Sequence, residues 1–526
     1  MNADETPTID PAVQSEKPGG QTCNAACKPI RQNNNPVEQG MEKSIFKEKI
    51  LGAWLGKAVG GTLGQPYEGC DGPLALTYYD PVPAEMVPND DLDLQILAAY
   101  VLLKQPVPKI SRTTFAKMWL DHVQFCWDEY GKALQNLQAG MMPPATGEYD
   151  NFFTDGLGAA IRSELWACLA PGDPTLAARY AYEDACIDHA GEGIYAAQFL
   201  AAMESQAFTE NHLDRLLDAG LAVIPAESRL AQAVRDVRVW CAESSDAAVI
   251  RTQILAKWGS ENFTDAVMNI PFVIMALLLG KGDFGRTICL AVNCGRDADC
   301  TGATAGALMG LMDPKGIPAK WLAPIGRRCV LSPQIIGITP PQTLDELADW
   351  VMDIHDRLPP FEEPENPPSA GPRPLSARCG VFRWWFAQDE NKFRPELPTT
   401  AVRRQFPGWK AGIPRSDVPN DSLYLMQFRF RLARSRNVRV MFNTPENSRV
   451  WLDGKYLFGR EGGRMAPSLH RCPQNQYADV ELTGGTHELL CGIAPLSGAE
   501  QLNWVMGFGD PETKLFFPGE ELQMEE

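Results

Sequence analysis

The chain has 526 residues and a formal net charge of -18, and hydrophobic residues make up 44% of it. This composition is typical of a globular protein and excludes a fibrous or wholly disordered chain. Such a length exceeds what one hydrophobic core serves, so we expect at least two domains. The acidic excess argues against a nucleic-acid partner, which needs clustered Lys and Arg, and favours a cation.

Residues 1–42 are polar and contain many Pro, Gly, Gln and Asn residues, so we expect a disordered N-terminal segment. This segment has no basic start followed by an apolar stretch, which argues against a secretory signal and predicts a cytoplasmic protein. No run of about 18 apolar residues occurs, so we expect no membrane partner. Cys23 and Cys27 have no second Cys or His pair at zinc-site spacing, so they predict no structural zinc.

Residues 43–358 carry apolar side chains at every third or fourth position, which is the pattern of packed helices. We therefore expect a mainly α fold class with an all-helical domain over this range. Glycines recur every four residues between Gly52 and Gly64, which places them on one helix face where a neighbouring backbone can approach closely. The clearest helical runs are residues 46–59, 92–103, 193–208, 266–279 and 344–354.

The composition changes at residues 359–376, where seven prolines exclude a helix and predict a stiff linker. Residues 377–526 then alternate between apolar and polar positions, as at 423–430, which predicts strands. Asp453-Gly454 suits a tight hairpin turn that needs positive φ, and Gly484-Gly485 is a second candidate. We expect a smaller antiparallel β-sandwich, whose pattern resembles the accessory modules fused to glycosidases.

Two acidic clusters are the informative features of the helical domain. Asn89-Asp90-Asp91 opens a helical run, with Asn89 at the N-cap position, and Asp297 and Asp299 open another. Either cluster alone is explained by the attraction of carboxylates to the positive end of a helix dipole. If the two helix starts face each other, four carboxylates converge and need hard cations, which predicts Mg²⁺, Ca²⁺ or Mn²⁺.

The order of the motifs resembles the ADP-ribosylglycohydrolase family over roughly 300 residues. That family opens with a glycine-rich helix ending in a Glu, which is matched by Gly52 to Gly64 and Glu68. The further matches are Asn89-Asp90-Asp91 for the Thr-Asp-Asp motif, Gly156 to Arg162 for Gly-x-Gly-Ala-Ala-x-Arg, His189 for a histidine that touches the ribosyl group, and Asp297-Ala298-Asp299-Cys300 for Asp-x-Asp-Thr.

The resemblance implies a glycoside hydrolase in which two Mg²⁺ ions position the ribose and a water. A metal lowers the pKa of that water and orients the sugar ring while positive charge builds up on it. The implied metal ligands are Asn89, Asp90, Asp91, Asp297, Asp299, Cys300 and Thr301. The implied catalytic residues are Glu68, Asp90, Asp91 and Asp299, and the implied substrate-binding residues are Gly156, Gly158 and His189.

Three positions depart from the family pattern. Asn89 replaces a Thr but still offers a carbonyl oxygen, and Lys57 replaces an Asp of the glycine-rich helix. Cys300 replaces a Thr that adds a hydroxyl ligand. A thiol is a poor ligand for a hard cation, so either one ion is lost or weakly bound, or Thr301 takes this place through a small shift.

The sequence therefore predicts metal-dependent hydrolysis of a glycosidic bond at an ADP-ribosyl or related ribosyl group, with an ADP-ribosylated protein or a small-molecule glycoside as partner. One alternative is hydrolysis of another O-glycoside or furanoside on the same scaffold. Another is a non-catalytic protein that binds ADP-ribose or a sugar. Tryptophans of the β-sandwich are candidates for holding carbohydrate, although filling the core is their commoner role. They are Trp384, Trp385, Trp451 and Trp504.

Overall fold

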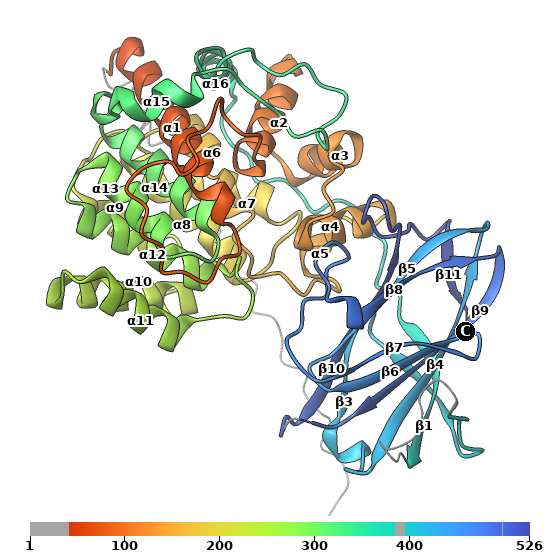
Figure 1. Cartoon of the computed structure of the whole chain (residues 1–526). Coiled ribbons are helices and arrows are strands. Elements are labelled where there is room, and N and C mark those ends of the chain that lie inside the picture. The colour runs from red at the N-terminus through yellow and green to blue at the C-terminus, as the bar shows by residue number, and fades with distance from the viewer. Residues whose placement is uncertain (1–40, 384–394, 497, 526) are drawn as a thin grey trace, which may run out of the picture.

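The computed structural model of the chain describes residues 41–383, 395–496 and 498–525. The predictions for residues 1–40, including Cys23 and Cys27, and those for Trp384 and Trp385 lie outside these ranges. Figure 1 shows a helical domain built from the N-terminal half and a β domain built from the C-terminal part. This arrangement confirms the predicted fold class. Within the described ranges, every helix is too short or too polar to cross a membrane.

The helical domain packs its helices around one apolar core, and α12 is buried at every position except Leu278. All five helical runs predicted from the apolar periodicity are present. The α-helices in the described ranges are α1 (Lys43–Gly64), α2 (Asp90–Lys104), α3 (Arg112–His122), α4 (Asp128–Gln138), α5 (Ala145–Glu148), α6 (Glu164–Leu169), α7 (Pro174–Ala185), α8 (Glu192–Gln206), α9 (Leu213–Ala222), α10 (Arg229–Glu243), α11 (Ala247–Trp258), α12 (Ala266–Gly280), α13 (Phe284–Asn293), α14 (Ala298–Met312), α15 (Ala319–Ile325) and α16 (Leu344–Arg357).

Helices α1 and α14 lie backbone to backbone and run in opposite directions. At each facing pair, a methyl group added to the α1 glycine would overlap a carbonyl of α14, so only glycine allows this approach. The pairs are Gly52 with Gly310, Gly56 with Gly306, Gly60 with Gly302, and Gly64 with Ala298. The close approach predicted for this helix face is therefore present. It brings the C-terminal end of α1 to the N-terminal end of α14.

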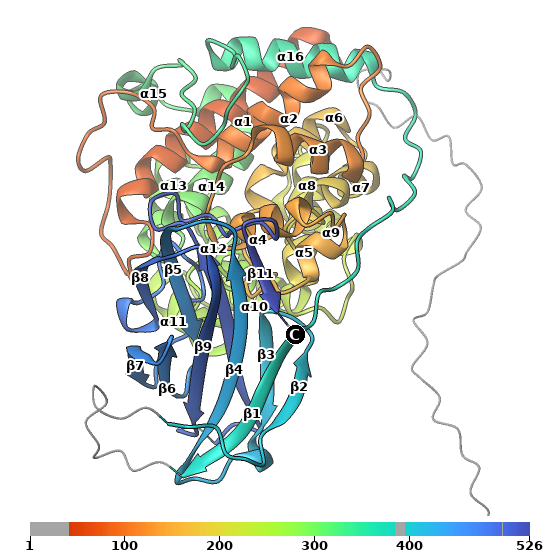
Figure 2. The ribbon, with the colours of Figure 1, turned by 90° about the vertical axis from the view of Figure 1, so that its right-hand side faces the viewer.

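The segment between the domains forms neither helix nor strand, because α16 ends at Arg357 and β1 begins at Leu375. The Ala370 amide donates to the Gly140 carbonyl at 3.0 Å, and the Met142 amide donates to the Ser369 hydroxyl at 2.9 Å. These bonds tie the segment to the helical domain. Figure 2 shows it running down the outside of the helices toward β1.

The β domain consists of two antiparallel sheets. One has the order β2-β1-β4-β9-β6-β7, with β11 also paired to β4, and the other has the order β3-β10-β5-β8. The strands are β1 (Leu375–Arg383), β2 (Val402–Phe406), β3 (Lys410–Pro414), β4 (Ser422–Leu432), β5 (Arg436–Asn443), β6 (Asn447–Leu452), β7 (Lys455–Glu461), β8 (Tyr477–Leu482), β9 (Gly485–Ala494), β10 (Gln501–Gly509) and β11 (Leu522–Glu525).

Alternating residues of the two sheets form the core between them. Phe428 and Phe430 of β4 pack there with Val440 of β5 and Trp504 of β10. Trp451 is also buried, in a smaller cluster with Leu490 of β9. Trp451 and Trp504 thus take the core role that is common for such residues, and their indole rings are not available to hold a carbohydrate.

The two predicted hairpin turns have different outcomes. Asp453 and Gly454 have φ values of 48° and 82° and join the paired strands β6 and β7, so the first prediction is confirmed. The prediction for Gly484-Gly485 is wrong, because β8 pairs with β5 in one sheet while β9 pairs with β4 and β6 in the other. Here the two glycines lie where the chain crosses from one sheet to the other, and Gly485 has a φ of 131°. A glycine pair indicates a sharp turn but not which strand is the partner.

The two domains contact each other near α4 and the loop that follows α5. The Tyr149 hydroxyl donates to the Pro407 carbonyl at 3.0 Å, and the Lys410 ammonium donates to the Asn151 carbonyl at 2.7 Å. A cleft of about 370 Å³ lies beside this contact. It is lined by residues of both domains, among them Met141 and Tyr149 on one side and Trp409 and Phe508 on the other.

Candidate active site

Helix α2 begins as the sequence predicts, with Asn89 as its N-cap. The Asn89 side-chain oxygen accepts a hydrogen bond from the Asp91 amide at 2.8 Å, which satisfies one of the free donors of the first turn. Asp90 is half-buried and Asp91 is buried. The cap therefore fixes where the two carboxylates leave the helix.

Helix α14 begins after a left-handed turn, with φ of 69° at Gly295 and 65° at Arg296. The Arg296 carbonyl accepts from the Gly69 amide at 2.8 Å, and the Arg296 amide donates to the Cys70 carbonyl at 2.6 Å. These two bonds tie the loop after α1, which carries Glu68, to the turn before Asp297. The charges of Glu68 and Asp297 consequently act on each other.

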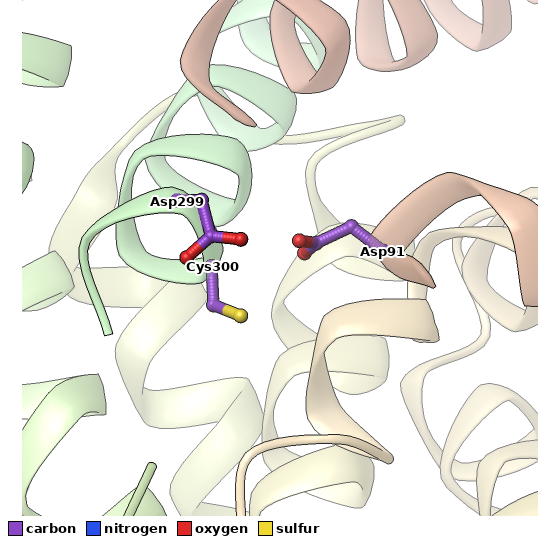
Figure 3. Close-up of side chains that lie close together, drawn as sticks. All are labelled: Asp91, Asp299 and Cys300. Atoms are coloured by element: carbon purple, nitrogen blue, oxygen red, sulfur yellow. The ribbon is translucent and has the colours of Figure 1, made fainter. Parts of the chain in front are cut away.

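The two acidic clusters meet at this point. A carboxylate oxygen of Asp91, one of Asp299 and the sulfur of Cys300 all lie within 4.8 Å of one another. Figure 3 shows the Asp91 and Asp299 carboxylates facing each other across a gap, with the Cys300 sulfur beside them. The Asn89 amide nitrogen also donates to Asp299 Oδ2 at 3.0 Å. The helix starts thus face each other, as the metal hypothesis requires.

The crowded carboxylates hold their protons more strongly than free ones. Burial, and then the charges of Glu68 and Asp90, raise the pKa of Asp299 to about 8. Burial and the neighbouring carboxylates also raise the pKa values of Asp91 and Asp297. Glu68 lies at the exposed edge of the cluster, where partial burial of its carboxyl and then the charge of Asp90 raise its pKa to about 7.

Lys57 of α1 lies beneath the cluster and is fully buried. Its ammonium lies 3.4 Å from Asp91 Oδ1 and 2.9 Å from Glu164 Oε1. Burial alone would lower the pKa of Lys57, but the Glu164 and Asp91 carboxylates outweigh it and raise that pKa. The sequence marks Lys57 as a departure from the family pattern but does not reveal that its partner is Asp91.

The loop at residues 156–158 lies against α4. The Tyr130 hydroxyl donates to the Gly158 carbonyl at 3.2 Å, and a methyl group on Gly156 would lie 3.1 Å from the Glu129 carboxylate oxygens. Asp90 lies near Tyr130 as well. Burial raises the pKa of Asp90, and a hydrogen bond with the Tyr130 side chain partly offsets this rise. Sequence reasoning missed Glu129 and Tyr130, since they lie in an ordinary helical pattern with no motif around them.

His189 is behind this loop and is completely buried. Its Nε2 lies 3.4 Å from Glu129 Oε1, and its Nδ1 lies 3.0 Å from Asp188 Oδ1. Burial lowers the pKa of His189, but Asp188 and Glu129 outweigh it and raise the value to about 9. Both ring nitrogens face carboxylates, so direct contact between His189 and a sugar stays a prediction.

Two other predicted ligands form hydrogen bonds within the protein. The Thr301 hydroxyl donates to the Ala298 carbonyl at 3.2 Å, inside α14. The Asn89 side-chain oxygen is the helix cap described above. Metal coordination by these two residues stays a prediction.

The β domain places one arginine beside the cluster. Arg471 lies between β7 and β8, and its guanidinium forms a bidentate ion pair with Asp128 at the start of α4. It also stacks over the Phe263 ring, with 4.3 Å to the centroid. Its charge opposes the rise in the Glu68 pKa, so it lies within electrostatic reach of that carboxyl. Sequence reasoning missed Arg471 because an isolated arginine in a β-domain loop carries no motif.

The comparison with protein families decides the assignment of the chain. A family model described as ADP-ribosylglycohydrolase matches residues 42–359, which is more than half of the chain. The chain belongs to the ADP-ribosylglycohydrolase family. The matched range covers the helical domain and hence both acidic clusters, so this ADP-ribosylglycohydrolase domain carries the candidate active site. The β domain lies beyond the match.

Individual proteins are similar to parts of this ADP-ribosylglycohydrolase family member. An uncharacterized protein from Archaeoglobus fulgidus is 26% identical over 334 residues, covering 60% of this chain and 99% of the relative. A solved structure titled ADP-ribosylglycohydrolase-related protein complex is 20% identical with a TM-score of 0.41, covering 60% of this chain and 99% of that one. A GH31 alpha-xylosidase from Xanthomonas citri is 14% identical with a TM-score of 0.16, covering 30% of this chain and 16% of that one.

Proposed function

We propose that this protein hydrolyses a glycosidic bond at an ADP-ribosyl or related ribosyl group with the help of a divalent cation. The observation that carries the proposal is the meeting of Asp91 from α2 and Asp299 from α14 beside the exposed Glu68. Membership of the ADP-ribosylglycohydrolase family supports a glycoside hydrolase of this kind.

The chemistry of the donor set fits a divalent cation. Both carboxylate oxygens of Asp91 and Oδ1 of Asp299 are buried without a hydrogen-bond partner among the described residues. Buried carboxylates without such partners are unfavourable unless a counter-charge stands beside them. We therefore assign Asp91 and Asp299 as ligands, with Asp90 and Asp297 adjoining them. A bound ion would orient sugar hydroxyls and lower the pKa of a water.

The protein's own residues divide the remaining tasks. Glu68 is exposed and has a pKa of about 7, so its carboxyl can both give up and accept a proton near neutral pH. Asn89 holds the Asp299 carboxylate through its amide nitrogen. We assign Gly156 and Gly158 to the substrate side of the site, with His189 and Glu129 fixing the loop from behind.

The test compares two substrate classes with and without EDTA. One arm measures release of ADP-ribose from ADP-ribosylated protein, and the other measures release of nitrophenol from a panel of nitrophenyl glycosides, furanosides included. We expect EDTA-sensitive release of ADP-ribose. Turnover of the panel alone would assign another glycoside, which the departures at Lys57 and Cys300 make a reasonable second candidate. A melting temperature raised by ADP-ribose without any product would indicate a binding protein.

A single substitution tests the role of the second acidic cluster. Asp297→Ala removes a buried carboxylate from the start of α14 and should abolish cation binding and hydrolysis while the chain still folds. Glu227→Ala, at an exposed position away from the cluster, is the matched control and should leave both unchanged. Wild-type turnover in Asp297→Ala would contradict the assignment.

A further inference from the structure

The residue that replaces the family threonine has its sulfur beside the two facing carboxylates, and its thiol also hydrogen-bonds to the Asp297 carboxyl. Cys300 follows Asp299 in the first turn of α14, and its sulfur lies within 4.8 Å of ligand oxygens from both Asp91 and Asp299. The thiol is buried, and Figure 3 shows the sulfur on the side that faces Asp91. Two carboxylates and one sulfur therefore surround the gap.

Cys300 places a sulfur where a Mg²⁺ ion would need an oxygen ligand. Mg²⁺ takes six oxygen ligands in a nearly octahedral arrangement, and a sulfur is a poor substitute. The Asn89 side-chain oxygen accepts from the Asp91 amide, and the Thr301 hydroxyl donates to the Ala298 carbonyl. A donor set of two carboxylates and a thiolate instead suits Zn²⁺ and similar ions, which keep an open fourth position for water at catalytic sites.

A fixed cation already stands beside the cluster. The Lys57 ammonium lies 3.4 Å from Asp91 Oδ1 and 2.9 Å from Glu164 Oε1, and all three side chains are buried. Any divalent ion at Asp91 is repelled by this ammonium in the low-dielectric interior, and a second ion would add its own repulsion to that of the first. Lys57 thus supplies part of the positive charge that the carboxylates need.

From these observations we infer that the site takes one first-row transition-metal ion of the Zn²⁺ type, held by Asp91, Asp299 and Cys300, in place of the Mg²⁺ pair that the family resemblance implies. The inference rests on the proposed metal-dependent function and specifies its ion. Binding converts the Cys300 thiol to a thiolate, and the released proton passes to solvent.

The experiment uses the full chain freed of metal and titrated with Co²⁺, Zn²⁺ and Mg²⁺. We expect one Co²⁺ or Zn²⁺ per chain, an intense near-ultraviolet sulfur-to-cobalt absorption, and Zn²⁺ binding at least about tenfold tighter than Mg²⁺ binding. Cys300→Thr should lose the absorption, bind Zn²⁺ at least about tenfold more weakly and gain affinity for Mg²⁺. Cys70→Thr, which removes an exposed free thiol on the neighbouring loop, should behave as the wild type.

The outcomes separate this inference from the proposed function. Two equivalents of Mg²⁺ in the wild type, unaffected by Cys300→Thr, would overturn the inference and leave the proposed hydrolysis intact. A sulfur-bound ion in a protein that hydrolyses no substrate of either class would uphold the inference and reject the function. Failure of both the wild type and Cys300→Thr to bind any of the three ions would reject both.

Discussion

The interiors of the two domains are built on different principles. The β domain fills the space between its sheets with apolar side chains such as Phe428 and Trp504. The helical domain also has an apolar core, but it buries pairs of ionisable groups beside that core, with Lys57 against Asp91 and Arg162 against Asp188. Apolar burial needs no partner, whereas each buried charge depends on another. Groups of the candidate site therefore contribute to the stability of the helical domain, whereas the core between the sheets of the β domain contains none of them.

The largest expected change in stability follows from the substitution of Lys57. Lys57→Met keeps the length of the side chain but leaves Glu164 and Asp91 without their cation, which should lower the free energy of unfolding by about 3–5 kcal/mol. Urea unfolding of the wild type and the variant measures this difference in free energy. Trp504→Phe, a change within the apolar core of the β domain, is the comparison and should cost clearly less. A Lys57→Met protein as stable as the wild type would contradict the contribution of this site to the stability of the helical domain.

The second test uses pH. The pKa of His189 is raised from about 6.5 to about 9 by Asp188 and Glu129, so the folded state favours the protonated ring. The resulting stability is complete below pH 6.5, is lost as the pH rises through 9, and amounts to roughly 3 kcal/mol. Unfolding of the wild type and His189→Asn at pH 6 and pH 9.5 should show the difference between them shrinking at the higher pH.

His487 is the matched residue in the β domain. Its Nδ1 lies 2.7 Å from Asp453 Oδ2, and the Asp453 carboxylate is largely exposed, so water screens the pair. His487→Asn should therefore produce a smaller pH-dependent change than His189→Asn. Equal changes for both variants would mean that burial of the pair does not govern the effect.

The third test concerns the contact between α1 and α14. Gly60→Ala places a methyl group where the Gly302 carbonyl lies, so the helices must separate at a cost of about 2 kcal/mol. Gly371→Ala is the control, because an added methyl there has open space around it. Thermal unfolding of both variants, with cation affinity as a second readout, checks whether separation of the helices also loosens the acidic cluster.

The smallest effect expected is at the arginine that links the domains. Arg471→Ala removes the partner of Asp128 at a partly exposed contact, which should lower the free energy of unfolding by about 1 kcal/mol. Because the charge of Arg471 acts on Glu68, we also expect a higher KM. Arg464→Ala changes an exposed arginine of the same loop and should alter neither quantity. An unchanged KM in Arg471→Ala would confine the β domain to a structural role.

Much of the helical fold can be predicted from the sequence because it depends on local patterns, whereas the meeting of the two acidic clusters is expected only from the family resemblance. Apolar periodicity predicts the helices, and the four-residue glycine spacing predicts a close neighbour. Asn89 is recognisable as a cap because the residues after it form a helical run. The pairing of β9 cannot be predicted from Gly484-Gly485, since a turn signal carries no information on partner strands.

Contacts between distant segments are the part that the sequence conceals. Lys57 and Glu164 lie far apart in the chain and become partners only when folding brings the start of α6 to α1. Glu129 reaches His189 through the start of α4, and Arg471 comes from another domain. Glu129, Glu164 and Arg471 stand in no motif that the sequence singled out, and the partners of Lys57 and His189 are identified only in the folded chain.

The contact between α1 and α14 has a consequence for how this site can change. Its spacing is set by backbone atoms at residues that lack side chains, such as Gly56 and Gly306. Asp299 and Cys300 lie between Ala298 and Gly302, the two residues of α14 that face Gly64 and Gly60, and they are not themselves among the facing pairs. An exchange of Thr for Cys, or of Asp for Lys, therefore leaves the distance between the helices unaltered. Single substitutions at the ligand positions can therefore change the metal preference while the packing of α1 against α14 stays the same.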